Sequence, residues 1–333
     1  MLDGSPFFII GVPRSGTTLL RDLLARHTAI TLPPEESQFL PDLIRARELV
    51  ADDAAFLGLA KKIVERSNYA FLMQLRHKVS AKALTERLFC ADPVAVLRDV
   101  VVASRPQANL PGTVLWGDKT PNYAWMAEEI LKWAPSAKFV HIVRDPRDVA
   151  MSMATAWSKS ALRSALDWRK TEIHLDTLKS RGLLHGSNLL ELKYEDLLAE
   201  PRPQLSRICS LLGVNFEQSM LDLPASSERW GQGAGHRGVK SDNSGKFLQN
   251  VDSRTIRVVE SICVDRMRAH GYAALQIDPG AEPRIPGSFA VRLAALRDAV
   301  RVIGAYVQEF GLFEGIRYKL RQRGVRALRR TTV

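Results

Sequence analysis

The sequence predicts an α/β fold in which a parallel β-sheet is flanked by helices. Three short apolar runs, at residues 5–12, 138–143 and 188–194, each continue into a segment whose apolar residues recur at helical spacing. Strands that alternate with helices in this way are typical of a parallel sheet covered on both faces. At 333 residues the chain is long enough to bury one large core and to carry an appendage.

The first two units show how each strand passes into its helix. The run FFII ends at Gly11, and four leucines between residues 19 and 24 then follow at helical spacing. In the second unit KFVHIV precedes Asp145, which can cap a helix whose first turn contains Pro146. Both units therefore read as strand, loop and helix.

A third unit and one further helix complete the predicted domain. The strand at 188–194 precedes a helix that Gly213 ends, and residues 252–272 place their apolar residues on one helical face. A linker rich in proline and glycine at 276–288 then marks a boundary. We predict a P-loop-type α/β domain over residues 1–276.

Two segments lie outside the strand and helix units. Residues 37–112 are dense in Leu, Ala, Arg and Lys with few turn signals, which predicts a helical insertion that caps a site. Residues 287–333 predict a basic amphipathic helical tail, in which an apolar stripe precedes seven Lys and Arg within RYKLRQRGVRALRR. Such a tail can lie on anionic lipid, or it can be a solvated helix that packs along the domain.

Composition limits the partners without choosing one. The formal net charge of +11 favours anionic partners, but no recognised RNA or DNA module is present, so nucleic acid is not expected. Cys90, Cys209 and Cys263 lie far apart among apolar neighbours, which predicts core residues without disulfide or metal spacing. The start lacks a secretory pattern and no apolar run is long enough to span a bilayer, so we expect a cytoplasmic protein, with peripheral membrane contact through residues 289–333 as an option.

The stretch GVPRSGTT at residues 11–18 has the spacing of a phosphate-binding P-loop. A strand that feeds a glycine loop and a helix presents unpaired backbone N–H groups and the positive end of the helix dipole to an anion. Thr17, however, stands where the nucleotide-binding motif has its lysine, and Arg14 is the one cation of the loop. A ligand whose terminal group carries less charge than a triphosphate can do without that lysine and its metal.

PRSGTTLL resembles the 5′-phosphosulfate loop of the sulfotransferases that use 3′-phosphoadenylyl sulfate (PAPS). Several segments of the chain, in the order of that family, share the likeness, which extends over residues 7 to about 272. The resemblance implies that PAPS is the co-substrate, that adenosine 3′,5′-bisphosphate is its product, and that no metal is needed. In this loop it implies contacts to the nucleotide from Arg14, Ser15, Gly16, Thr17 and Thr18.

IVRDPRDVAMS resembles the 3′-phosphate site of the same family. Arg144 would close a strand and Ser152 would lie about two turns into the next helix, so both side chains can meet at one phosphate. The alternative is that Arg144 forms a structural ion pair with Asp145 or Asp148.

Three further segments carry family likenesses. GDKTPNY resembles the KTP segment of bacterial sulfotransferases and implies a catalytic role for Lys119, whereas a solvated lysine at a helix start is the alternative. KYEDLLAEP implies that Tyr194 lies near the nucleotide, unless it only packs at the end of a strand. HRGVKSDNSGKF resembles a late basic loop, with Arg237 and Lys246 as candidate nucleotide contacts or as parts of a surface loop.

The catalytic base must be sought outside the KTP segment. The phenol and steroid sulfotransferases have a histidine two residues after the lysine, but Pro121 occupies that position here and cannot take a proton. LPPEESQF resembles the segment that carries a glutamate in protein-tyrosine sulfotransferases, which implies that Glu36 is the base. One extra residue before the glutamates and Gln38 in place of arginine depart from that pattern, so a protein-tyrosine acceptor is not expected. The alternative is that Glu36 only begins the first cap helix.

Together these features predict an enzyme that moves a sulfuryl group from PAPS to a hydroxyl acceptor, such as a sugar, glycolipid, phenol or natural product. Arg14 and Lys119 are predicted to neutralise charge as the bond to the leaving group breaks. The competing hypotheses are a P-loop nucleotide kinase and a non-catalytic protein that binds nucleotide or a membrane surface. The acceptor itself cannot be inferred from the sequence.

Overall fold

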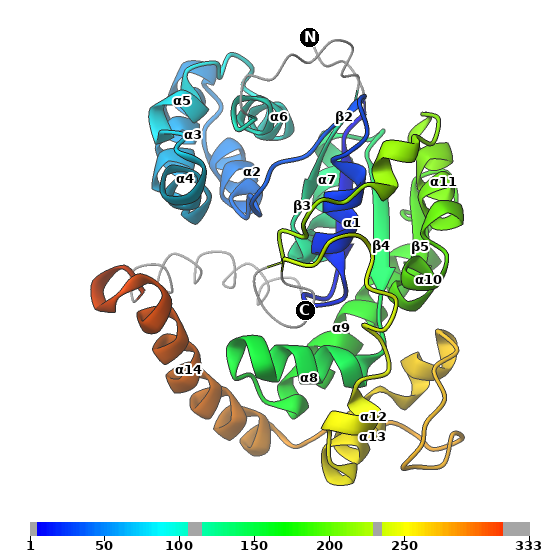
Figure 1. Ribbon diagram of the computed structural model, residues 1–333. Coiled ribbons are helices and arrows are strands. Elements are labelled where there is room, and N and C mark those ends of the chain that lie inside the picture. The colour runs from blue at the N-terminus through cyan, green and yellow to red at the C-terminus, as the bar shows by residue number, and fades with distance from the viewer. Residues whose placement is uncertain (1–4, 106–114, 229–234, 316–333) are drawn as a thin grey trace.

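A five-stranded parallel sheet organises the chain (Figure 1). The computed structural model describes residues 5–105, 115–228 and 235–315. Neighbouring strands pair in parallel throughout, with β1 at the centre, where Ile9 lies opposite Lys119 on one side and Val140 on the other. The strand order across the sheet is β2 (Ile30–Thr31), β3 (Leu115–Lys119), β1 (Phe7–Gly11), β4 (Lys138–Val143) and β5 (Leu189–Lys193).

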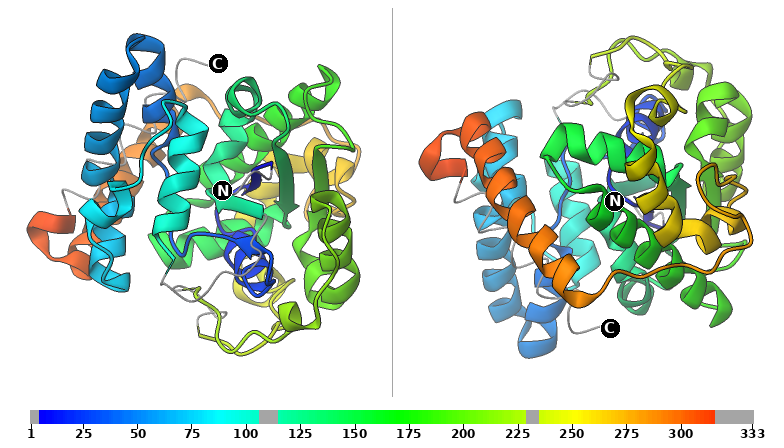
Figure 2. Two further views of the ribbon diagram at one scale, coloured as in Figure 1. Left: turned by 90° about the horizontal axis from the view of Figure 1, so that it is seen from above. Right: turned by 90° about the horizontal axis from the view of Figure 1, so that it is seen from below.

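Helices cover both faces of this sheet because alternate strand residues point to opposite sides. Phe7 and Ile9 of β1 pack on one face with α1, α10 and α11, whereas Phe8 and Ile10 pack on the other with the cap. Seen from above and below, the cap helices and the α10–α11 pair stand at opposite sides of the molecule (Figure 2). The first face carries α1 (Thr17–Leu24), α10 (Tyr194–Ala199), α11 (Pro201–Leu212) and the short η3 (Gln218–Leu221).

The second face carries the cap and two further helical segments. The cap consists of α2 (Leu40–Leu49), α3 (Asp53–Arg66), α4 (Asn68–Leu72), η1 (Met73–His77), α5 (Ala81–Thr85) and α6 (Pro93–Ala103). Beneath it lie η2 (Pro121–Met126), α7 (Ala127–Trp133) and part of the long α9 (Ala161–Ser180). The segment predicted as a helical insertion is mostly helical over its described part, residues 37–105.

A third cluster of apolar side chains lies at the carboxyl edge of the sheet. It joins α8 (Pro146–Trp157), α9 and α13 (Ser253–Ala269), with the short α12 (Phe247–Asn250) beside α8. Asp145 caps α8, since its carboxylate accepts a hydrogen bond from the backbone N–H of Arg147. Trp168 of α9 is fully buried and donates to the carbonyl of Arg144 at 3.0 Å, which fixes the chain just after β4.

Most predicted elements are present, and two strands were missed. Gly213, at φ +81°, ends α11 as expected. The short β2 has only two residues, and β3 contains Gly117, Asp118 and Lys119, so neither carries an apolar or alternating pattern. The prediction that all three cysteines are core residues is wrong for Cys90, which is exposed, whereas Cys209 and Cys263 are buried free thiols.

The last described helix, α14 (Ser288–Phe310), rests against α8 and α9 on the outside of the molecule (Figure 2). The predicted tail is therefore docked on the domain through its first half. Its remaining part, residues 316–333, lies outside the described residues. No helix in the described ranges combines the length and apolar character needed to cross a bilayer.

His141 is a buried titratable residue on β4, an inner strand of the sheet. It is fully buried on β4, with Nδ1 3.0 Å from Glu191 and Nε2 3.3 Å from Glu172, which in turn contacts His270 at 2.9 Å. Burial alone would lower the pKa of His141, but the two carboxylates outweigh it and raise this pKa to about 9. Its interpretation as a hydrogen-bonded core residue rather than a catalytic group fits this position.

The His141→Gln variant tests this ion pair. The folded pKa lies above the unfolded value of 6.5, so the contribution of the pair to stability is complete below pH 6.5 and is lost as pH rises toward 9. Because Glu172 would lose a buried partner, we expect the free energy of unfolding at pH 6.5 to fall by about 3 kcal/mol. Denaturant unfolding at several pH values gives the free energy of unfolding as a function of pH. Between pH 6.5 and 9 this free energy should change less with pH in the variant than in the wild-type protein. An unchanged dependence on pH would show that His141 is uncharged in the folded protein.

Candidate functional site

Four predicted site residues stand where neighbouring strands end. Arg14 follows β1, Lys119 is the last residue of β3, Arg144 follows β4 and Tyr194 follows β5. These strands are adjacent in the order β3, β1, β4, β5 and all run in parallel, so their carboxyl ends meet at one edge of the sheet. Ligands of open α/β sheets bind at this edge, where the strand order reverses direction.

The loop between β1 and α1 has backbone angles that restrict its sequence. Gly16 has φ +93° and lies so close to Tyr194 that an added Cβ would be 2.1 Å from the tyrosine ring. Only glycine fits there without displacing the ring. Gly16 also begins α1 without a side-chain cap, and the hydroxyl of Ser15 is fully buried with no hydrogen-bond partner within the described chain. The loop therefore offers an anion both backbone N–H groups and a hydroxyl.

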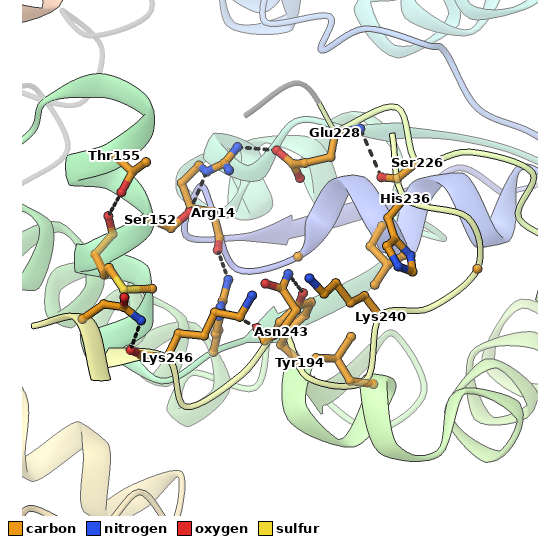
Figure 3. Close-up of a pocket in the computed structure, with 17 residues that line it drawn as sticks. Arg14, Ser152, Thr155, Tyr194, Ser226, Glu228, His236, Lys240, Asn243 and Lys246 are labelled. Carbon is orange, nitrogen blue, oxygen red and sulfur yellow. Dashed lines mark hydrogen bonds and ion pairs between the residues drawn. The ribbon is translucent and has the colours of Figure 1, made fainter. Parts of the chain in front are cut away.

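A cavity of about 240 Å³ opens beside this loop (Figure 3). Its lining carries four cationic side chains and, among the described residues, one carboxylate, Glu228. The cations are Arg14, Arg144, Lys240 and Lys246. Such an excess of positive charge in a concave site attracts a ligand with more than one negative charge.

Arg144 lines the cavity and is held by contacts from several segments. Its guanidinium lies 4.5 Å from the centre of the Tyr194 ring and donates to the carbonyls of Arg14 (3.3 Å) and Asn243 (2.8 Å). The structural alternative is present as well, because Asp148 lies 3.5 Å from Arg144. Nε of Arg144 is nevertheless buried and, within the described ranges, has no hydrogen-bond partner. The position of Arg144 is thus fixed by its neighbours, while its Nε–H has no acceptor within the described ranges.

Arg14 lies across the cavity from Tyr194 (Figure 3). Its Nε donates to the hydroxyl of Ser152 at 3.1 Å, and its guanidinium pairs with Glu228. The structure therefore brings Arg14 together with Ser152 and Arg144 in one cavity, while Lys119 does not line it. The backbone of Arg14 has φ +75°, an unusual conformation for a residue other than glycine.

The late basic loop, residues 236–247, also lines the cavity. The ammonium groups of Lys240 and Lys246 point into it, and Asn243 donates to the Tyr194 hydroxyl at 2.7 Å (Figure 3). Burial lowers the pKa of Lys246, and the nearby charge of Lys240 lowers it further. Arg237 is exposed outside this lining, where its Nε donates to the carbonyl of Pro224 at 3.2 Å.

A second group of site residues lies on the cap side of α1. Lys119 is almost fully buried, and its ammonium lies 2.8 Å from Glu36 and 3.5 Å from the hydroxyl of Thr18. Burial alone would raise the pKa of Glu36, but Lys119 outweighs it, so that the pKa is lower than usual. Gln38 also donates to this carboxylate, at 2.9 Å. Thr17 is buried at the start of α1, next to Thr18.

Glu35 has a different position from its neighbour. Its carboxylate contacts Arg76 at 3.0 Å and His77 at 3.2 Å, both on η1 of the cap. Of the two glutamates, Glu36 is the one that the structure places against Lys119. The assignment of Glu36 rather than Glu35 to the site is consistent with this geometry.

Sequence reasoning missed three residues that shape the site. Glu228 lies outside every motif, so nothing in the sequence indicates that it reaches the cavity, whereas Asn243 lies within the late basic loop, three residues before Lys246, and was not singled out there. Asp118 precedes Lys119 and is fully buried, and burial raises its pKa to about 6 despite Thr120 and Ser37 nearby. The sequence shows only that Asp118 precedes Lys119; its burial, which makes it a candidate site residue, comes from the structure.

Comparison with known proteins decides the family. The sequence profile described as "Sulfotransferase family" matches residues 6–218, which include both phosphate-site motifs, Glu36 and Lys119. The chain belongs to the sulfotransferase family. Membership of this family counts against the nucleotide-kinase hypothesis.

Individual relatives are distant and cover only part of the chain. Protein-tyrosine sulfotransferase 2 of Gallus gallus is 25% identical over 231 residues, which are 64% of this chain and 52% of that protein. An omega-hydroxy-beta-dihydromenaquinone-9 sulfotransferase of Mycobacterium bovis is 32% identical over 113 residues, 30% of this chain and 29% of that protein. The chain thus spans about half of the first relative and less than a third of the second.

Solved structures show the same fold. The sulfotransferase domain from the curacin biosynthetic pathway superposes with a TM-score of 0.52 at 21% identity and covers 82% of this chain and 99% of that domain. The parallel sheet flanked by helices, predicted from the alternating units, is therefore the sulfotransferase fold.

The Lys119→Met variant tests the electrostatic coupling at this site. Burial raises the pKa of Glu36, and Lys119 lowers it, so removal of the Lys119 ammonium should raise this pKa. The hydrogen bond from Gln38 would still lower it in part. The carboxyl carbon of Glu36, assigned by comparison with Glu36→Gln, can be titrated by ¹³C NMR. Lys132→Met, at an exposed lysine of α7, is the control and should leave this pKa unchanged. An unchanged pKa in Lys119→Met would contradict the coupling.

Proposed function

We propose that this protein transfers the sulfuryl group of PAPS to a hydroxyl acceptor and releases adenosine 3′,5′-bisphosphate. The observation that carries the proposal is that one cavity joins the glycine loop to Arg144 and Ser152, with Lys119 and Glu36 at the far side of the same loop. A nucleotide with phosphates at both the 5′ and the 3′ positions of its ribose needs a set of cations and hydrogen-bond donors for each phosphate. Family membership supports the choice of sulfuryl transfer.

The residues at this site fit a nucleotide that carries a phosphosulfate at its 5′ position and a phosphate at its 3′ position. The first N–H groups of α1, with Ser15, Thr17 and Thr18, would bind the 5′-phosphosulfate. Arg144 and Ser152, with Lys246 from the late loop, would bind the 3′-phosphate. The buried Ser15 hydroxyl and the Nε of Arg144 support this fit, because each is a polar atom that lacks a partner within the described ranges.

Arg14 would exchange one anion for another when the nucleotide binds. Its guanidinium is paired with the carboxylate of Glu228, which occupies the cavity as a phosphate or sulfonate oxygen would. We propose that Arg14 leaves Glu228 for the nucleotide and, with Lys119, neutralises charge on the oxygen that leaves sulfur. A sulfonate carries one negative charge, so cationic side chains and N–H groups can suffice without a divalent ion.

Glu36 is proposed as the base. The acceptor hydroxyl forms its bond to sulfur as the bond between sulfur and the phosphate oxygen breaks, and its proton passes to the carboxylate of Glu36. The lowered pKa keeps Glu36 ionised at neutral pH, which is the form that can accept a proton. Lys119 lies between the two roles, because its ammonium contacts both Glu36 and Thr18 at the start of α1.

The acceptor is proposed to be a small-molecule, glycan or lipid hydroxyl that enters beneath the cap. The names of the two relatives give protein tyrosine and omega-hydroxy-beta-dihydromenaquinone-9 as their acceptors, so the family admits very different acceptors. Departures at Gln38 and before Glu35 argue against protein tyrosine here. Sugars, glycolipids, phenols and natural products remain the acceptor classes to test.

Transfer from labelled PAPS to a panel of these acceptors, with divalent metals chelated, tests the proposed activity directly. Labelled acceptor should accumulate together with adenosine 3′,5′-bisphosphate. Turnover of ATP in place of PAPS, or nucleotide binding without transfer to any acceptor class, would contradict the proposal and favour a non-catalytic nucleotide-binding protein.

The Glu36→Gln variant tests the role of the base. Amide replaces carboxylate at nearly the same size, so the nucleotide should still bind while kcat falls by about a hundredfold or more. Glu35→Gln is the matched control, since that side chain pairs with Arg76 and His77 instead of Lys119. Equal turnover in Glu36→Gln and the wild-type protein would remove Glu36 from the mechanism.

A further inference from the structure

One face of α14 holds this helix on the domain. Asp298 is almost fully buried there, and its carboxylate accepts hydrogen bonds from the backbone N–H and hydroxyl of Ser160, both at 3.1 Å, and from Arg163 at 2.9 Å. Val291, two turns earlier on the same face, packs against the cluster formed by α8, α9 and α13. These contacts fix which side of α14 faces the body and which faces outward.

The outward face is an apolar stripe. Its members are spaced by four, three and four residues, so they lie in one line along the helix. Their side chains are unusually exposed for apolar residues. Among the described residues, no other element covers them. They are Phe289 (78%), Leu293 (39%), Leu296 (66%) and Val300 (68%).

Arginines of α14 flank this stripe, and within its described residues 288–301 no acidic side chain does. Arg292, Arg297 and Arg301 are all exposed. Asp298 is the sole acidic residue between 288 and 301, and it is the one that faces the body. In the sequence, seven more Lys and Arg follow between residues 317 and 330. The exposed half of the helix is thus apolar along its middle and positive along its edges.

The charge distribution distinguishes between two partners that an apolar stripe can have. A second copy of the same helix would bring arginines against arginines, and such like-charge contacts are unfavourable. An anionic membrane offers an apolar layer for the stripe and negative headgroups for the flanking arginines. We infer that the outward face of α14 binds the surface of an anionic lipid bilayer. Asp298 and Val291 meanwhile keep the helix on the domain.

This docking would place the enzyme on the membrane rather than through it. The axis of α14 would lie parallel to the bilayer plane, with the stripe at the boundary between headgroups and acyl chains. Figure 1 shows α14 running outward from beneath α8 toward the side of the molecule that carries the cap. The inference does not depend on the proposed sulfuryl transfer, since it concerns a surface apart from the cavity residues.

Vesicle flotation of the full chain tests the inference. Vesicles of phosphatidylcholine alone are compared with vesicles that also contain phosphatidylglycerol. The double variant Leu296→Asp/Val300→Asp places two charges in the stripe. The matched control is Leu49→Asp/Phe89→Asp, which changes the net charge equally at two exposed apolar residues of the cap segment, Leu49 (76%) and Phe89 (79%).

We expect the wild-type protein and the control to float with anionic vesicles and to bind less at high salt. The partition coefficient of the stripe variant should fall at least about tenfold, because two apolar side chains no longer enter the bilayer. Both variants should keep the thermal unfolding midpoint of the wild-type protein, which shows that any loss concerns the surface and not the fold.

Three results would overturn the inference. Wild-type protein that does not bind anionic vesicles would remove it outright. Equal binding by the stripe variant would assign any affinity to the basic residues after α14 alone. A concentration-dependent dimer, seen by light scattering and abolished in the stripe variant but not in the control, would show that a second copy covers this face.

Discussion

The ring of Tyr194 joins the parts of the site, and the rest of the arrangement depends on its contacts. The glycine loop approaches it so closely that residue 16 can have no side chain, the Arg144 guanidinium lies over it, and Asn243 of the late loop donates to its hydroxyl. Segments from β1, β4, β5 and the late loop therefore meet at one aromatic residue. Because Arg144 also donates to the backbone of Arg14, a shift of the ring would move the loop between β1 and α1 and Arg144 together.

The electrostatics of the site divide into two halves that share α1. On the cavity side, cations outnumber carboxylates, and the lowered pKa of Lys246, caused by burial and by Lys240, reflects their crowding. On the cap side, Lys119 and Glu36 balance each other, and Asp118 lies behind them with a pKa raised by burial to about 6. The first half is suited to holding an anion, and the second to moving a proton beside it.

The sequence was informative where local geometry restricts residue type. Gly16, the cap at Asp145 and the alternation of strand and helix follow from short-range rules, and they predicted the fold and the loop. The strand β3 escaped prediction because it is buried among other elements while it carries glycine and charge, a pattern that only tertiary packing explains. Likewise Glu228 reaches the cavity through a long-range contact, since more than two hundred residues separate it from Arg14. No local pattern encodes such contacts.

The proposed role of Arg144 in binding the 3′-phosphate is central to this site, and calorimetry can test it directly. Adenosine 3′,5′-bisphosphate and adenosine 5′-phosphate would be titrated, with divalent metals chelated, into the wild-type protein and Arg144→Ala. We expect the wild-type protein to bind the bisphosphate more tightly than the monophosphate. Arg144→Ala should remove most of this difference and leave the affinity for the monophosphate nearly unchanged. A variant that kept the full preference for the bisphosphate, or a wild-type protein without one, would contradict this role of Arg144.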